Sequence, residues 1–141
     1  MTTLEYFAQA HRLDQRINSD LKEIDELRAL ACSISSPGWG ERINSSGPKE
    51  PAFVHSLEKI MMLEADIDRE IDALVDLKEQ MREVIGELPD ANEQLAVKYR
   101  VLHGYTWDAI GNELHIDAKT ARRWFEEGVA HTRLPEYPIK I

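Results

Sequence analysis

Two long stretches with an apolar residue at every third or fourth position constrain the fold of this chain more than any other feature. The apolar positions of the first stretch are Ala10, Leu13, Ile17, Ile24, Leu27, Ala31 and Ile34. Those of the second stretch are Leu57, Ile60, Ile67, Ile71, Leu74, Met81, Ile85 and Leu88. Asp20 interrupts the first stretch, and Glu64 and Lys78 interrupt the second. This spacing predicts two amphipathic helices of about 30 residues each, which need a partner to cover their apolar stripes.

The segment between the two stretches, residues 35–50, is rich in Ser, Pro and Gly and is therefore unsuited to a helix. A loop of this length lets the two helices fold back on each other. We therefore predict a long antiparallel, coiled-coil-like hairpin over residues 1–88. Trp39 in its loop either covers the end of the hairpin or anchors a partner.

Four further apolar residues widen the second stripe beyond a two-stranded seam: Met61, Leu63, Leu77 and Val84. Met61 and its neighbour Met62 are expected to fill the core or its margin. The wide stripe predicts that two hairpins associate as a homodimer with four helices. A third apolar surface within the same chain would cover the stripe equally well.

The charge balance changes where the second stretch ends. Residues 1–88 carry 10 basic and 18 acidic side chains, whereas residues 89–141 carry 7 and 8. Pro89 is unsuited to a continuing helix and Asp90 is suited to cap a new one, so the two residues predict a boundary at this point. We expect residues 1–88 to serve oligomerisation and residues 89–141 to form a second domain with a short C-terminal tail. The net charge of -9 excludes a polycation that coats nucleic acid indiscriminately.

Residues 89–141 predict three short helices. Asp90 and Glu93 have the spacing of a capping pair for the first helix, and Gly104 follows its end. Thr106 is suited to cap a second helix over residues 107–114, and Asp117 a third helix that starts at residue 118. A tight turn therefore joins the last two helices.

A small residue in the second of these helices, Gly111, lets it cross the third closely, and the spacing is that of a helix-turn-helix. On the third helix Lys119, Arg122 and Arg123 point away from the apolar side chains. The N-terminal half of a recognition helix enters the major groove, where Lys and Arg bind phosphates and guanine. The predicted contacts with double-stranded DNA are Thr106, Ala118, Lys119, Arg122 and Arg123.

The sequence offers no pattern for catalysis, a cofactor, a metal ion or a small-molecule substrate. The single cysteine excludes an intramolecular disulfide, and the five histidines lack the paired spacing of metal ligands. The N-terminal residues lack the basic and apolar segments of a secretion signal, and no apolar run is long enough to span a membrane. We therefore expect a non-enzymatic protein in the cytoplasm of a host cell.

Four segments resemble a family of small phage and prophage proteins from low-GC Gram-positive bacteria, filed as a domain of unknown function. They are 27–35 (LRALACSIS), 41–47 (ERINSSG), 57–60 (LEKI) and 73–78 (ALVDLK). The C-terminal part is similar to the fourth region of sigma factors and to ArpU/RinA-type activators of phage late genes. The resemblance covers most of residues 4–133. It implies a phage-encoded transcriptional regulator that binds DNA and touches host RNA polymerase.

Two positions depart from the sigma-type pattern: His115 stands where Gly is usual in the turn, and Gly111 stands where Ala is usual. A side chain at the glycine position is expected to alter the geometry of the turn. Two other functions remain open from the residues alone. One is a small terminase-like subunit for DNA packaging, and the other is an interaction module that acts on host RNA polymerase without binding DNA. A dimer favours the regulator, whereas a ring of about eight or more copies favours packaging.

Overall fold

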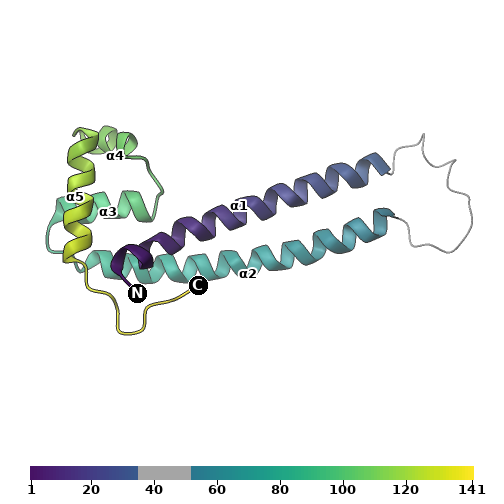
Figure 1. Cartoon of the computed structure of the whole chain (residues 1–141), viewed down its shortest axis with the longest axis horizontal. Helices are drawn as coiled ribbons and strands as arrows, with labels where there is room; N and C mark the ends of the chain where they lie inside the picture. Colours follow the sequence, from purple (N-terminus) through teal and green to yellow (C-terminus); the bar gives the residue numbers. More distant parts are fainter. Residues whose placement is uncertain (35–51) are drawn as a thin grey trace, which may run out of the picture. The chain divides into compact units, whose positions relative to one another are not determined.

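The computed structural model describes residues 1–34 and 52–141, and within them it contains five α-helices and no strand (Figure 1). The helices are α1 (Thr3–Ile34), α2 (Ala52–Gly86), α3 (Ala91–Val101), α4 (Trp107–Leu114) and α5 (Ala118–His131). The predicted all-α class is confirmed. The predicted loop at residues 35–50, with Trp39, lies outside the described residues.

The chain divides into two compact units, and each contains part of α1 and part of α2. Unit 1 consists of Met1–Asp14 and Asp72–Ile141, and unit 2 consists of Gln15–Ile71. The predicted boundary between residues 88 and 89 separates α2 from α3 but does not coincide with this division. The reason is that Leu88 of the segment after α2 is buried in the same core as Val97 of α3. A proline and a change of charge here mark the end of a helix inside a continuous core.

The core of unit 1 joins the start of α1, the second half of α2, α3 and α5. Its buried residues are Tyr6, Phe7, Ala10, Leu77, Met81, Val84, Ile85, Leu88, Val97 and Leu102. Phe125 and Val129 of α5 pack against this cluster, as do Leu134 and Ile139 of the tail that follows. Burial of apolar side chains from all these segments is the main force that holds the short helices in place.

Two glutamine side chains hold the C-terminal tail on unit 1. Gln9 donates from Nε2 to the carbonyl of Ile139 at 2.9 Å, and its Oε1 accepts from the amide of Ile141 at 2.8 Å. Gln80 Oε1 accepts from the Ile139 amide at 2.9 Å and from the Tyr6 hydroxyl at 2.7 Å. Burial raises the pKa of Tyr6 to about 12, so this hydroxyl remains a donor even in alkaline solution. The tail therefore packs down on α1 and α2.

In unit 2, the apolar stripes of α1 and α2 supply the buried residues. These include Ile17, Ile24, Ala31, Ile60 and Ile67. At the surface, Arg28 of α1 and Glu64 of α2 form an ion pair at 2.6 Å. Asp20 is the polar interruption of the first stripe, and burial together with the interaction with the Asp20 carboxyl group raises the pKa of Glu70. A pair of carboxyl groups thus stands where the stripe lacks an apolar residue.

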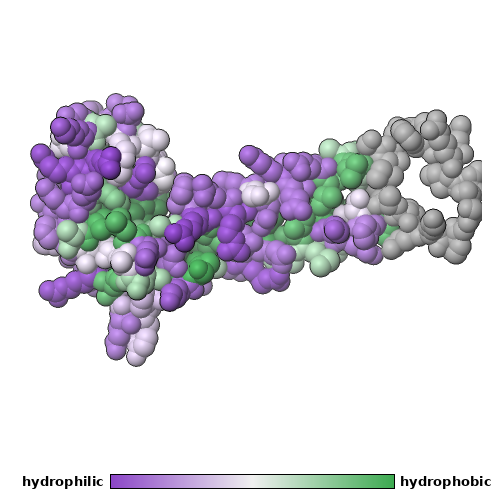
Figure 2. Space-filling view, viewed as in Figure 1, coloured by the Kyte–Doolittle hydropathy of each residue, from purple (hydrophilic) through white to green (hydrophobic). Residues whose placement is uncertain are grey.

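The expected positions of the two methionines were wrong. Leu77 and Val84 are buried as predicted, but Met61 and Met62 are 68% and 70% exposed. Each helical residue turns by about 100°, so Met61 and Met62 point away from the face that carries Ile60 and Ile67. Figure 2 shows apolar side chains in green on the surface of the long helices, among mostly hydrophilic ones. The second helix therefore exposes apolar surface that the chain itself leaves uncovered in the described residues.

Candidate nucleic-acid interface

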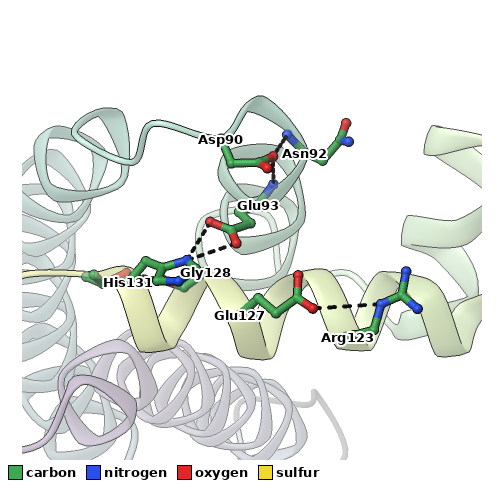
Figure 3. Close-up of polar contacts among 8 residues, drawn as sticks. Asp90, Asn92, Glu93, Arg123, Glu127, Gly128 and His131 are labelled. Carbon is green, nitrogen blue, oxygen red and sulfur yellow. Dashed lines mark hydrogen bonds and ion pairs between the residues drawn. The ribbon is translucent and has the colours of Figure 1, made fainter.

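Side-chain caps fix the start of each of the last three helices. Asp90 accepts hydrogen bonds from the amides of Asn92 and Glu93 at 2.8 and 3.2 Å (Figure 3). Thr106 Oγ1 accepts from the Ala109 amide at 3.2 Å. Asp117 accepts from the Thr120 amide at 2.8 Å, and its hydrogen bonds with Thr120 lower the pKa of its carboxyl group. The predicted caps at Asp90, Thr106 and Asp117 are confirmed, and each satisfies amides that a helix leaves unpaired.

The turn between α4 and α5 folds closely over Gly111. His115 adopts a left-handed conformation (φ 58°, ψ 44°) at the end of α4, and the Ile116 amide donates to the Gly111 carbonyl at 3.0 Å. A Cβ atom on Gly111 would lie 2.6 Å from the Ile116 carbonyl oxygen. Gly111 is therefore needed where the backbone of the turn passes, and His115 occupies a conformation that favours glycine.

Helix α5 has one face toward the core and one toward solvent. Ala121 and Gly128 are buried, and Phe125 is half-buried. Lys119, Arg122 and Arg123 are exposed in the first half of the helix. Among the other predicted contacts, Ala118 is half-buried as the first residue of α5, and Thr106 is exposed at the start of α4. The cations thus share an accessible surface at one end of α5.

Two acidic side chains on the next turn of α5 pair with the arginines. Arg122 Nε lies 3.2 Å from Glu126 Oε1. Arg123 Nε lies 3.9 Å from Glu127 Oε1 (Figure 3). Within the described residues, Lys119 forms no ion pair. The sequence analysis identified the three cations but missed these pairs, although the signal for them is a spacing of four residues on one helix.

Glu93 binds a residue far away in the sequence instead of completing the predicted capping pair. Both carboxylate oxygens lie near His131 Nδ1 of α5, at 2.9 and 3.0 Å (Figure 3). The Glu93 side chain is 7% exposed, whereas that of His131 is 60% exposed. A Cβ atom on Gly128 would lie 2.6 Å from Val97 Cγ2 and 3.3 Å from Glu93 Cβ, so this glycine lets α5 approach α3. Nothing in the local sequence indicates the contact.

The contact between His131 and Glu93 predicts that unit 1 loses stability as the pH rises. The hydrogen bond and the charge of Glu93 raise the pKa of His131 above its ordinary value of 6.5. The stabilisation is complete below the ordinary pKa and is lost as the pH rises through the raised pKa, because neutral His131 no longer compensates the buried carboxylate. Chemical denaturation across this range is expected to show a falling free energy of unfolding. His131→Gln should remove that fall, whereas His103→Gln, at an exposed histidine of the same unit, should retain it; equal slopes in both variants would contradict the assignment.

None of the helices in residues 1–34 and 52–141 is long and apolar enough to cross a membrane. Within the same ranges, no three His, Cys, Asp or Glu side chains are grouped so that they hold a metal ion.

The chain belongs to a family described as protein of unknown function (DUF722), which it matches over residues 12–132. No curated protein and no solved structure matches the chain. The predicted membership of a family of unknown function is confirmed. The phage origin and the relation to sigma-type and ArpU/RinA-type proteins stay predictions.

Proposed function

We propose that this protein is a phage-encoded transcriptional regulator that binds double-stranded DNA through α4 and α5, which act as a helix-turn-helix. The observation that carries the proposal is the exposed group of Lys119, Arg122 and Arg123 in the first half of α5, opposite its buried face. In a helix-turn-helix this half of the second helix contacts base edges in the major groove. Arg122 and Arg123 are proposed to read bases or bind phosphates, and Lys119 to bind a phosphate.

The local geometry of α4 and its turn supports the same docking. Thr106 and Asp117 start the two helices, and the turn packs directly on Gly111. The amides at the start of α4 that Thr106 leaves free are suited to a DNA phosphate. Ala118 stands at the start of α5, where its small side chain permits close approach of the DNA backbone.

The electrostatics predict weak binding by one copy. Residues 89–141 carry 7 basic and 8 acidic side chains, and Glu126 and Glu127 compete with phosphates for the two arginines. Two linked copies reading two half-sites compensate for a weak single contact. We therefore propose a homodimer, formed through the long helices, in which the exposed Met61 and Met62 contribute apolar surface. Late phage genes are the proposed targets, host RNA polymerase is a further proposed partner, and the host cytoplasm is the proposed location.

The proposal is tested by titrating the full-length protein onto fragments of the genome that encodes it, at two salt concentrations, with light scattering on the same sample. Selective, salt-sensitive retention of one intergenic fragment by a dimer is the expected result, because phosphate contacts release counterions. Retention by a ring of about eight or more copies would favour DNA packaging instead. No retention by the folded protein would overturn DNA binding and favour an interaction module.

Neutralising the two glutamates of α5 is expected to strengthen DNA binding. Each surface ion pair is worth about 0.2–1 kcal/mol, so Glu126→Gln combined with Glu127→Gln should lower the dissociation constant for DNA by about 2-fold to 30-fold. The matched control is Asp76→Asn with Glu79→Gln, which removes the same charge from exposed positions of α2. Fluorescence anisotropy with labelled DNA measures both. An equal gain in the control would attribute the effect to net charge alone.

A further inference from the structure

Unit 1 contains an apolar pocket on the core side of α4 and α5 that the proposed DNA contacts do not use. It has a volume of about 330 Å³ and is lined mainly by Leu4, Phe7, Ala8, Val101, Trp107 and Phe125. Phe7 is 4% exposed and lies deep, whereas Leu4 is 58% exposed at the rim. The Trp107 and Phe125 rings meet edge to face, with centroids 5.2 Å apart. Ligand pockets range upward from about 300 Å³, so this one suits a small ligand built on one or two fused aromatic rings.

One charge on the pocket wall is fixed and lacks an acidic partner. The Arg100 guanidinium lies 4.3 Å from the centre of the Trp107 ring, and its Nη1 donates to the Tyr105 carbonyl at 2.9 Å. Within residues 1–34 and 52–141, no carboxylate is within ion-pair distance of Arg100. A guanidinium has five N–H donors, so several remain for a ligand. Ring stacking and the carbonyl contact hold these donors in a defined orientation.

The other charged wall residue, Asp14, does not cancel this charge. Its Oδ2 lies 3.8 Å from Lys78 Nζ, so a cation outside the wall compensates it. His11 supplies a further polar edge. The pocket therefore combines an aromatic interior with one uncompensated positive group, and its complement is an apolar ring that carries one negative group.

We propose that this pocket binds a small hydrophobic acid, with the ring between Phe7, Trp107 and Phe125 and the carboxylate on Arg100. Such a ligand touches α1, α3, α4 and α5 of unit 1 together. Trp107 follows the Thr106 cap directly, and Phe125 lies two residues after Arg123. A bound ligand therefore restrains α4 and α5, the two helices that carry the proposed DNA contacts. This effect on DNA binding rests on the proposed function, whereas the ligand site itself does not.

Calorimetric titration of the full chain with naphthalene-2-carboxylate and with its uncharged analogue, naphthalene-2-carboxamide, tests the site without DNA. The acid is expected to bind one to one and about tenfold or more tighter than the amide, because a hydrogen bond to a charged group is replaced by a weaker one. Arg100→Gln should reduce acid binding to the level of the amide. Arg12→Gln, at an exposed arginine of α1 outside the pocket, should leave it unchanged.

Three results would overturn the site: equal affinity for acid and amide in the unaltered protein, no saturable binding of either, or equal losses in the two arginine variants. The first comparison needs no variant, so it stands even if Arg100→Gln unfolds. A second titration with DNA tests the consequence, for which the acid is expected to change the affinity for DNA. Unchanged affinity with the acid bound would overturn the coupling alone. Absence of DNA binding in either state would overturn the proposed function, while calorimetry still decides the site.

Discussion

Replacing Arg122 and Arg123 by glutamate is expected to weaken DNA binding by at least about 30-fold, since each arginine contact contributes about 1–3 kcal/mol. Both side chains are exposed on the first half of α5 and form ion pairs with Glu126 and Glu127 on the same helix. The reversal places negative charge against the phosphates while leaving the buried face of α5 unchanged. Anisotropy or gel retention with the selected fragment measures the loss.

The matched control reverses Arg12 and Arg82, two exposed arginines of unit 1 on α1 and α2. It changes the net charge by the same amount, so its smaller effect separates groove contacts from overall electrostatics. Charge reversal also creates repulsion between the new glutamates and Glu126 and Glu127 of α5. If the helix content falls for this reason, the neutral variant Arg122→Gln with Arg123→Gln serves as the test instead. Undiminished DNA binding by either α5 variant would place the interface elsewhere on the molecule.

Replacing Gly111 by alanine is expected to lower the free energy of unfolding of unit 1 by about 1–3 kcal/mol, the usual range for overpacking. The added methyl would lie 2.6 Å from the carbonyl oxygen of Ile116 and 3.4 Å from the Ala118 amide nitrogen. These are backbone atoms of the turn and of the start of α5, which have no rotamer by which to move aside. The turn must shift, so DNA binding should weaken together with stability.

Gly86→Ala is the matched control, because a Cβ atom there meets nothing within 4 Å. It adds the same methyl group to the last residue of α2 and is expected to be neutral or slightly stabilising. Urea denaturation followed by circular dichroism compares the two variants. If Gly111→Ala is as stable as the control, the turn has room for alanine, as in the sigma-type pattern, and the close contact over Gly111 is not essential.

Local features of the sequence predicted the helices well. Asp90, Thr106 and Asp117 cap helices where the pattern placed them, because a cap depends on amides two or three residues away. The exposure of Arg122 and Arg123 follows from helical periodicity, which the next few residues fix. His115 keeps the left-handed backbone conformation that favours glycine, so the altered turn geometry expected from a side chain at this position stays a prediction.

The sequence by itself determined the all-α class, the starts of the helices and the division of α5 into an apolar and a charged face. These features arise from interactions within about one turn of helix. Only the tertiary structure decided what depends on distant residues. It paired Glu93 with His131 across 38 positions, left Met61 and Met62 exposed, and brought Phe7, Arg100 and Phe125 to one pocket. Such contacts require the packing of whole helices, because the spacing of residues along one helix specifies a face and not the side chain that meets it.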